Sequence, residues 1–336
     1  MENQPPTPLH IFETLNAYQR TAALKTAIEF DLFTAIADGT NTAESLAAKC
    51  EASERGMRIL CDYLVVMEFL TKEENRYGLT PEAATFLNRH SPACIASAVT
   101  FLNSETLAQG FQNLSAAVKK GGTAIEEQGT IAPDHAVWVD FARAMAALQM
   151  MPAELIAQLI GAAQMGNCKV LDIAAGHGVF GIAIARHNPD AEIVALDWAA
   201  VLEVAKANAA QTGVADHYRT ITGSAFDVDL GDGYDLVLLT NFLHHFDAAT
   251  CEALLRKVHA ALKPGGRAVT FEFVPNDDRV SPPVPAGFAM VMLATTPQGD
   301  AYTFAEYEAM FSKAGFAKTA FHNLPPTMQQ VLVSQK

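Results

Sequence analysis

Cysteine is scarce in this sequence, and long hydrophobic runs are missing. The five cysteines stand far apart and form no Cys-x-x-Cys pair, which excludes a disulfide framework and the usual zinc sites. They are Cys50, Cys61, Cys94, Cys168 and Cys251. No apolar run approaches the roughly 18 residues that a membrane span needs. The N-terminus also lacks a basic-then-apolar signal pattern. We therefore expect a cytoplasmic protein with no membrane partner.

Positive charge is also in short supply. The 336 residues contain 23 Lys and Arg against 37 Asp and Glu, which gives a net charge of −14. Contacts to phosphate backbones and to anionic lipid both need clustered cations. The composition therefore argues against a nucleic-acid partner and against docking on a membrane. With 50% hydrophobic and 18% charged residues, the chain is typical of a globular protein, and it is long enough for two domains.

The pattern of the chain changes near residue 168. Residues 10–163 are rich in alanine, with apolar residues at three- and four-residue spacing, which predicts helices almost throughout. Short β-branched runs then alternate with helical stretches, which predicts a parallel sheet covered on both faces. The predicted strands are 169–173, 192–196, 218–222, 234–239, 267–273, 318–322 and 330–334. The last two are too close together for a crossover helix, so at least one should be antiparallel.

A winged-helix pattern lies inside the helical part. Residues 42–49 and 53–67 predict two helices, and residues 69–79 predict a hairpin. The second helix would read DNA in a winged-helix regulator, but its only cations are Arg55 and Arg58, with acids beside them. We therefore expect a module for dimerisation or for covering a site. A regulator that senses a small molecule is the less favoured alternative.

The strongest local signal is a glycine-rich turn after a buried strand. The stretch VLDIAAGHGVFG, residues 170–181, runs from a strand through a turn to a helix that starts near Val179. Gly176 and Gly178 have no side chain, so a ligand can approach the backbone closely. About 20 residues later, Asp197 ends the next apolar run, where an acid can bind both hydroxyls of a ribose.

The same glycines match the dinucleotide fingerprint, so a nicotinamide dehydrogenase is an alternative. Asp172 argues against it, because a carboxylate at that point would repel a pyrophosphate but could hold the cationic amino group of a methionine. The helical domain before the fold, the strand hairpin after it and the segment LKPGGR at 262–267 also argue against it. These features favour an adenosyl sulfonium ligand.

Taken in order, these motifs resemble those of class I S-adenosylmethionine-dependent methyltransferases. The resemblance rests on the Asp172 loop, Asp197, Tyr234–Leu239 and Leu262–Gly266. The winged-helix start, Gly223–Phe226 and Leu243–Asp247 narrow it to small-molecule O-methyltransferases of the plant caffeic acid and bacterial polyketide type. It implies S-adenosylmethionine as cofactor, S-adenosylhomocysteine as product, and a homodimer joined through helices around Leu15–Phe33.

The expected fold is α/β. A mainly helical winged-helix domain precedes a Rossmann-like doubly wound sheet, which is mostly parallel with an antiparallel C-terminal strand. We expect a dimerisation domain at residues 1–100, a helical connector and pocket wall at 101–163, and a cofactor-binding domain at 164–336.

The resemblance also implies roles for individual residues. The methionine part of the cofactor would lie against Asp172, Ala174, Ala175, Gly176 and Gly178, the ribose against Asp197, and the adenine against Ser224, Ala225 and Phe226, with Trp198, Thr240 and Asn241 completing the site. The family often has glycines at positions 174 and 175 and an acid at 224. The adenine contact is therefore expected to be weaker or to use backbone groups.

The acceptor needs a general base, because a phenol has a pKa near 10 and is mostly protonated at neutral pH. His244 follows the fourth predicted strand at the carboxyl edge of the sheet, where ligands collect, and the resembling family uses a His there as base. Glu272 is its expected orienting partner. Two departures, His245 and Ala301 where the family has acids, leave open a different acceptor or transfer to carbon or nitrogen by proximity alone.

Two stretches rich in Met and Phe, residues 141–151 and 288–293, are candidates for an acceptor pocket. Thioethers and aromatic rings suit flat ligands, although core packing is the more usual explanation of such stretches. The predicted wall consists of Trp138, Phe141, Met145, Met290 and Met292. A small acidic cluster near the third strand, residues 227–232, is best explained as a solvated loop, so no metal is expected.

Overall fold

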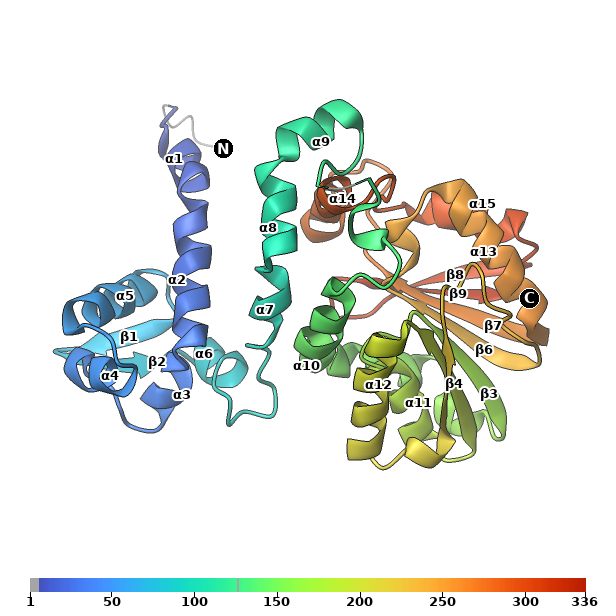
Figure 1. The fold of residues 1–336 in the computed structure, drawn as a ribbon, viewed down its shortest axis with the longest axis horizontal. Helices are drawn as coiled ribbons and strands as arrows, with labels where there is room; N and C mark the ends of the chain where they lie inside the picture. Colours follow the sequence, from blue (N-terminus) through green and yellow to red (C-terminus); the bar gives the residue numbers. More distant parts are fainter. Residues whose placement is uncertain (1–5, 126) are drawn as a thin grey trace. The chain divides into compact units, whose positions relative to one another are not determined.

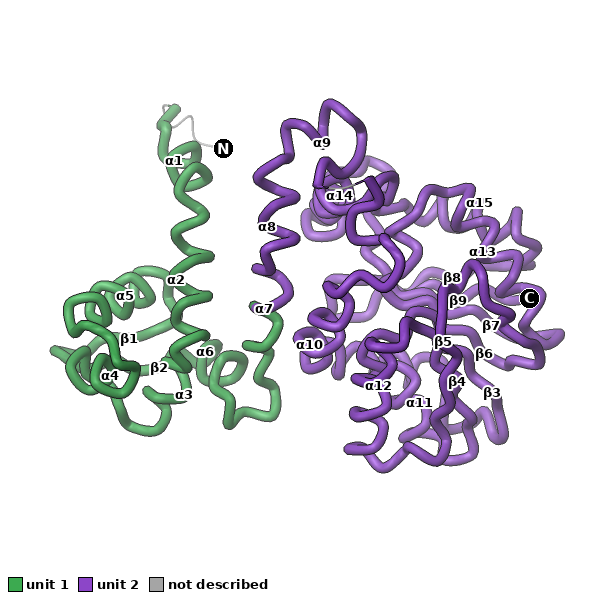
Figure 2. The backbone as a smooth tube through the Cα atoms, in the orientation of Figure 1, with its two compact units in different colours: residues 1–99 green, residues 100–336 purple. Residues whose placement is uncertain are grey.

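The computed structural model describes residues 6–125 and 127–336 and divides the chain into two compact units, residues 1–99 and 100–336 (Figures 1 and 2). The predicted connector, residues 101–163, falls within the second unit. None of the helices in the described part of the chain has both the length and the apolar character needed to cross a bilayer.

Unit 1 combines short helices with a two-stranded antiparallel hairpin. Its elements are α1 (Leu9–Leu15), α2 (Ala17–Glu29), α3 (Leu32–Ala37), α4 (Ala43–Lys49), α5 (Glu54–Val66), β1 (Leu70–Glu73), β2 (Arg76–Leu79) and α6 (Pro81–Phe86), and α7 (Ala98–Leu102) spans the boundary between the units. The side chains of Thr42 and Ser53 cap α4 and α5 by accepting hydrogen bonds from backbone N–H groups. The predicted winged-helix order of two helices and a hairpin is confirmed.

Unit 2 is built around a seven-stranded sheet in the order β5-β4-β3-β6-β7-β9-β8. The helices before the sheet are α8 (Glu105–Gln112), α9 (Leu114–Lys120) and α10 (Val137–Leu159). The sheet and its later helices are β3 (Cys168–Ile173), α11 (Val179–His187), β4 (Ala191–Asp197), α12 (Ala199–Gln211), β5 (Tyr218–Thr222), β6 (Tyr234–Thr240), α13 (Ala248–Ala261), β7 (Leu262–Glu272), α14 (Pro283–Thr295), α15 (Phe304–Lys313), β8 (Lys318–Asn323) and β9 (Gln330–Gln335). Only β9 runs against the other strands of this sheet, which confirms the predicted fold class.

Both faces of the sheet are covered because its central strands are apolar at successive positions. Side chains two residues apart along a strand point to the same face. Leu171 and Val237 therefore pack with the core under α13 and α15, whereas Val170 and Leu236 pack with the core under α10 and α11 (Figure 1). The carboxyl ends of β3, β4, β6 and β7 meet at one edge of the sheet, where the strand order reverses beside β3.

Two expectations about the elements were wrong in detail. Residues 10–163 are less helical than predicted, because Pro92 lies in a stretch without helix and Gly121, with a φ of 81°, ends α9. Strand β7 begins at Leu262, five positions before the predicted start. Leu262 pairs with Tyr234 and a register shift follows, so pairing with β6 extends the strand through a segment that looks like a turn.

Candidate active site

The turn after β3 has the backbone geometry of a close-approach loop. Ala174, Gly176 and Gly178 all have positive φ values, of 54°, 57° and 75°. A Cβ on Gly178 would lie 2.5 Å from the hydroxyl oxygen of Tyr218, so only glycine fits there. Helix α11 starts at Val179, as predicted, and directs its first N–H groups toward this loop. The loop therefore offers backbone rather than side chains to a ligand.

Two buried carboxylates flank the loop. The Oδ2 of Asp172 accepts a hydrogen bond from the Gly181 N–H at 3.2 Å, while its Oδ1 is buried without a partner among the described residues. Asp197 accepts hydrogen bonds from Gly176 N–H at 2.8 Å and from Trp198 N–H at 2.7 Å. A carboxylate has about four acceptor sites, so Asp197 can still accept bonds from ligand hydroxyls.

Burial sets the charge state of these acids. It raises the pKa of Asp172 to about 7, with a smaller contribution from repulsion by Asp197, and it raises the pKa of Asp197 to about 6. An unpartnered carboxylate oxygen in such surroundings favours a cationic ligand group. The carboxyl ends of β3 and β4, with the turn between β3 and α11, therefore fit a molecule that carries an ammonium group and a ribose.

The predicted adenine residues lie on the segment after β5. The Gly223 N–H donates to the Asp197 carbonyl at 3.0 Å, which ties this segment to the end of β4. The Ser224 Oγ accepts from the Phe226 N–H at 3.2 Å, and the Phe226 ring packs against Phe246 with 4.8 Å between centroids. Ala225 is buried. Sequence reasoning missed Lys257, which donates hydrogen bonds to carbonyls of this segment.

The predicted base and its partner meet at the ends of β6 and β7. His244 lies in a short 3-10 turn, residues 243–245, and its Nδ1 is hydrogen-bonded to the Oε2 of Glu272. The Oε1 of Glu272 accepts the N–H groups of Phe242 at 3.0 Å and Leu243 at 2.9 Å. Glu272 is fully buried, so all its interactions are internal. The carboxylate thus fixes one edge of the His244 ring and leaves the Nε2 edge without a partner in the described structure.

The last two predicted cofactor residues stand just before this turn. Thr240 ends β6 and is buried. Asn241 has a positive φ of 54°, donates its N–H to the Phe271 carbonyl at 2.9 Å, and is hydrogen-bonded through its side chain to Gln329. Backbone strain at Asn241 marks the point where the chain turns from the strand toward His244.

A row of rings connects the glycine loop to His244. Neighbouring ring centroids in this aromatic row lie 4.2–5.9 Å apart. The row consists of His177, Phe141, Trp138, His245, His244 and Phe288. Burial lowers the pKa of His177 to about 4, and burial together with His244 lowers the pKa of His245 well below its usual value. Both imidazoles are therefore neutral, and each has one buried ring nitrogen without a partner in the described structure.

The methionines of the predicted acceptor wall differ in placement. Met145 and Met292 are buried, whereas Met290 is 46% exposed. Residues two apart on a helix point to different sides, so α14 does not present Met290 and Met292 on one face. Phe288 belongs to the predicted stretch 288–293 but was not among the five residues named for the wall. It contacts His244 at 4.8 Å between centroids and lies four residues before Met292 on the same helical face.

The missing family acid is not replaced by its neighbour. Ala301 is buried, and the Asp300 carboxylate interacts with Arg279 at 3.4 Å, although the Asp300 N–H donates to the His244 carbonyl. Among the described residues, no group of three or more His, Cys, Asp or Glu side chains could hold a metal ion.

Comparisons with known proteins agree with this geometry. Residues 111–317 match the model of the O-methyltransferase domain, and residues 12–89 match that of the O-methyltransferase dimerisation domain. The chain is 25% identical to the tetracenomycin polyketide synthesis 8-O-methyl transferase TcmO of Streptomyces glaucescens, over 92% of this chain and 91% of that protein. It is 27% identical to acetylserotonin O-methyltransferase of Mus musculus, over 92% and 83%.

Solved structures give the same answer. A crystal structure from Nostoc punctiforme described as an O-methyltransferase is 57% identical, with a TM-score of 0.95, and the match covers 98% of this chain and all of that one. Human N-acetylserotonin methyltransferase in complex with S-adenosylmethionine has the same fold, with a TM-score of 0.85 at 20% identity over 100% and 99% of the two chains. Nothing supports the regulator alternative. The chain belongs to the S-adenosylmethionine-dependent O-methyltransferase family.

Proposed function

We propose that this enzyme methylates an aromatic hydroxyl of a small molecule, with His244 as general base and Glu272 as the residue that orients it. The observation that carries the proposal is the hydrogen bond between His244 Nδ1 and a buried Glu272, at the sheet edge that also carries the glycine loop. A carboxylate that accepts from Nδ1 leaves Nε2 free to take a proton.

S-adenosylmethionine, when bound, supplies a methyl group on a sulfonium that reacts readily with an oxygen nucleophile. His244 Nε2 removes the hydroxyl proton of the acceptor as the new oxygen–carbon bond forms. The electron pair of the broken sulfur–carbon bond stays on sulfur, so the products are a methyl ether, S-adenosylhomocysteine and one proton, which His244 passes to solvent. Alignment of the reacting atoms by the protein supplies most of the remaining rate enhancement.

In this proposal the acids at the loop bind the cofactor. Asp172 pairs with the ammonium of the methionine part, and Asp197 accepts the ribose hydroxyls. The backbone of Gly176 and Gly178 lies along the part of the methionine that joins these two groups, with Ala174, Ala175 and Trp198 beside it. Ser224, Ala225 and Phe226 contact the adenine, and Thr240 and Asn241 complete the site. The unpartnered Oδ1 of Asp172 supports the first assignment.

The acceptor in this proposal is flat and aromatic. Trp138, Phe141, Met145 and Met292 form its wall, with Met290 nearer the pocket rim because of its exposure. The names of the relatives point the same way, since one acts in tetracenomycin polyketide synthesis and another, from Streptomyces sahachiroi, on 3-hydroxy-5-methyl-1-naphthoate. Rings packed edge to face, as Trp138 packs on His245, suit a planar ligand.

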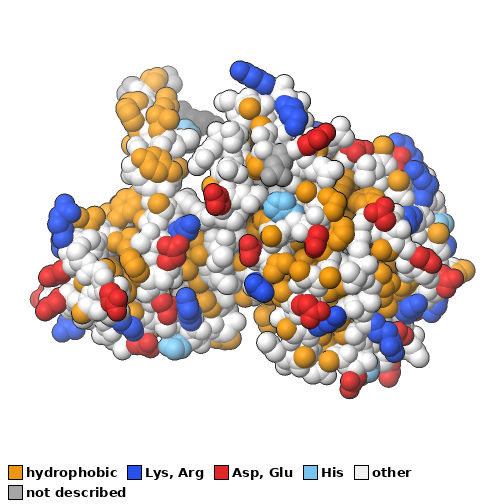
Figure 3. Space-filling view, viewed as in Figure 1, with side chains coloured by type: hydrophobic (Ala, Val, Ile, Leu, Met, Phe, Trp, Pro, Cys, Tyr) orange, Lys and Arg blue, Asp and Glu red, His pale blue; other side chains and the backbone are white. Residues whose placement is uncertain are grey.

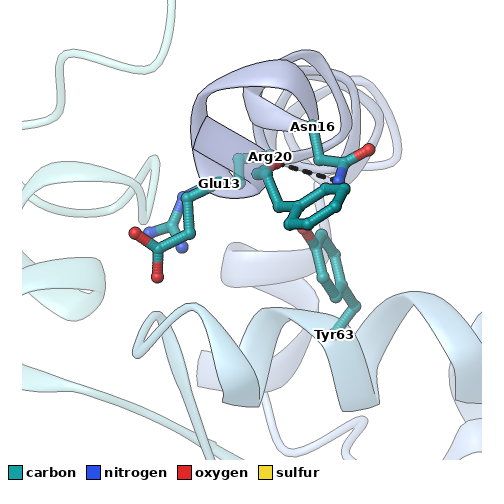
Figure 4. Close-up of a pocket in the computed structure, with 5 residues that line it drawn as sticks. Glu13, Asn16, Arg20 and Tyr63 are labelled. Atoms are coloured by element: carbon teal, nitrogen blue, oxygen red, sulfur yellow. Dashed lines mark hydrogen bonds between the residues drawn. The ribbon is translucent and has the colours of Figure 1, made fainter. Parts of the chain in front are cut away.

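The enzyme acts as a homodimer through its N-terminal unit in this proposal. Helix α1 buries none of its residues, and its apolar side chains gather on one exposed projection (Figure 3). The exposed apolar side chains of α1 are Leu9, Ile11, Phe12 and Leu15, and Tyr18 at the start of α2 is exposed as well. Below them lies a groove of about 500 Å³ between α1, α2 and α5, lined by Phe12, Glu13, Asn16, Arg20 and Tyr63 (Figure 4). A group of neighbouring exposed apolar side chains is typical of an interface. A cytoplasmic location, supported by five unpaired cysteines, stays a prediction.

Transfer to carbon is the second candidate. The L-tyrosine C(3)-methyltransferase of Streptomyces lavendulae is 31% identical over 47% of this chain. The same base could deprotonate a phenol whose ring carbon then accepts the methyl group. Loss of the proton from that carbon and return of one to the oxygen would restore the aromatic phenol. Proton NMR of the product separates the two candidates, because a methoxy group and a ring methyl group resonate in different regions.

The test of the proposed base is His244→Ala. We expect kcat for methylation of a phenolic acceptor such as 2-naphthol to fall on the order of 10²-fold or more. The dissociation constant for S-adenosylhomocysteine should stay unchanged, because His244 is assigned to the acceptor. An unchanged kcat would remove His244 from the mechanism. Absence of S-adenosylhomocysteine binding by the wild-type protein would refute the proposed cofactor site.

A further inference from the structure

One ammonium group holds the segment that follows β5. Lys257, on α13, donates hydrogen bonds to the carbonyl oxygens of Ala225 at 2.9 Å, Phe226 at 2.7 Å and Val228 at 3.1 Å. A lysine ammonium has three N–H donors, so all of them are directed at four consecutive residues of one loop. The Lys257 side chain thus ties the loop 224–228 to α13 through three hydrogen bonds, an arrangement we call a clasp.

Lys120, Lys169 and Lys336 each donate to one backbone carbonyl, whereas Lys257 donates to three, and other lysines of unit 2 form ion pairs instead. Lys263 forms an ion pair with Asp235 at 2.8 Å, and Lys313 forms one with Glu252 at 2.7 Å. Lys257 has no carboxylate within ion-pair distance in the part of the chain that is described, so its charge is stabilised by carbonyl dipoles alone. A lysine that is half-buried against three carbonyls constrains a backbone, whereas an exposed ion pair contributes little.

The clasped loop is the one assigned to the adenine. Ser224 stands where an acid is usual in the family, so adenine recognition here depends on backbone groups. The Ser224 hydroxyl is already used by the Phe226 N–H, and the Ser224 carbonyl accepts the N–H groups of Asp227 and Val228, both at 3.0 Å. The Ser224 hydroxyl keeps one donor and one acceptor site but lacks the charge of a carboxylate, so the position of the loop backbone matters more for how well the adenine fits.

The same loop also packs against the turn that carries His244. The Phe226 ring lies 4.8 Å from Phe246 and 6.3 Å from Phe242, centroid to centroid. These two residues flank the 3-10 turn 243–245. These ring contacts do not involve Lys257, so removing the ammonium should loosen the adenine contact more than the packing beside the base.

We propose that Lys257 is a positioning residue that fixes the adenine-binding backbone by clasping the loop 224–228 to α13. It acts through the loop and touches neither substrate. This inference rests on the proposed function in one respect, namely that the loop binds the adenine.

The test compares Lys257→Met with Lys257→Gln and Lys257→Arg, and uses Lys313→Met as a matched control that removes an exposed ion pair. Calorimetry measures the dissociation constants of S-adenosylhomocysteine and of 5′-methylthioadenosine, which keeps the adenine and ribose but lacks the amino acid end. Steady-state kinetics with 2-naphthol gives kcat and both KM values.

We expect Lys257→Met to weaken both adenosine ligands and to raise the KM for S-adenosylmethionine by about tenfold. The KM for the acceptor and kcat should change by less than about threefold. Lys257→Gln, which keeps two donors, and Lys257→Arg should recover part of the affinity, and Lys313→Met should behave as wild type.

If Lys257 only stabilised the fold, its replacement would lower the unfolding temperature without raising the KM for S-adenosylmethionine more than the KM for the acceptor. Wild-type affinity in folded Lys257→Met overturns the proposal, and so does wild-type affinity in Lys257→Gln if the methionine variant does not fold. Equal losses for both substrates overturn it as well. If the wild-type protein binds S-adenosylhomocysteine but not 5′-methylthioadenosine, the assignment of the loop to the adenine fails, while the assignment of His244 stands.

Discussion

Replacing Glu272 by Gln tests the His244–Glu272 pair with almost no change in shape. The amide oxygen of Gln can still accept the N–H groups of Phe242 and Leu243, so the amide nitrogen then faces His244 Nδ1. Because that nitrogen can only donate, Nδ1 must become the acceptor and the ring proton must move to Nε2. His244 would then hold a proton on the atom that should receive one from the acceptor.

The opposite amide orientation is worse. It would present an NH₂ group to two buried backbone donors and leave them unsatisfied, at a cost of about 1–3 kcal/mol each. We therefore expect Glu272→Gln to keep the wrong tautomer and to lower kcat by on the order of 10²- to 10⁴-fold, which corresponds to about 3–5 kcal/mol of transition-state stabilisation.

The assay is steady-state methylation of 2-naphthol, with S-adenosylhomocysteine affinity and thermal unfolding measured in parallel. Affinity should stay within about twofold, since the substitution lies outside the assigned cofactor contacts. Glu203→Gln, an exposed carboxylate on α12, is the matched control and should leave kcat unchanged. A Glu272→Gln enzyme that retained kcat within about threefold would refute the argument about tautomers, whatever its stability.

Two further predictions concern the cofactor acid and the dimer. The folded-state pKa of Asp172 is raised to about 7, so the unliganded protein should lose up to about 4 kcal/mol of stability as pH rises from 4 through 7. Asp172→Asn should remove this loss in urea unfolding and yet weaken S-adenosylhomocysteine. Wild-type affinity should fall as pH drops from 8 to 6, and a flat profile would contradict the pairing with the ammonium. The double change Ile11→Asp and Leu15→Asp should raise the dimer dissociation constant by at least about a hundredfold in light scattering. Unit 1 should stay folded because α1 contributes no buried residue. A dimer of wild-type affinity would exclude this face.

The fold was predictable wherever one local pattern determined it. Apart from Asp172 and Asp235, the stretches Val170–Ile173 and Tyr234–Leu239 are apolar and lie in a central sheet covered on both faces, and such strands are visible in sequence as nearly continuous hydrophobic stretches. The cap at Thr42 likewise marks the start of α4. The early start of β7 was not predictable, because Lys263-Pro264-Gly265 has the local preference of a turn. This segment belongs to the strand only because β7 pairs with β6.

The candidate site was predictable where order along strands places residues at one edge. Asp197, His244 and Glu272 each follow or end a strand of the parallel sheet, so topology alone brings them to the same side. Lys257 and His177 could not be foreseen in their roles. The contacts of Lys257 depend on how α13 is rotated over a loop about 30 residues earlier in the chain. The contacts of His177 depend on which face of α10 meets the glycine loop. Neither rotation is encoded in a local sequence pattern.

Asp197 joins three parts of the chain at once. Its carboxylate accepts the N–H groups of Gly176 and Trp198, and its carbonyl accepts the N–H of Gly223. The residue assigned to the ribose therefore also links the turns after β3, β4 and β5 through its hydrogen bonds. A variant at position 197 would therefore bind the cofactor weakly for two reasons, because the turns are loosened and because a ligand contact is lost. Comparing the stability of the variants without ligand separates the two effects.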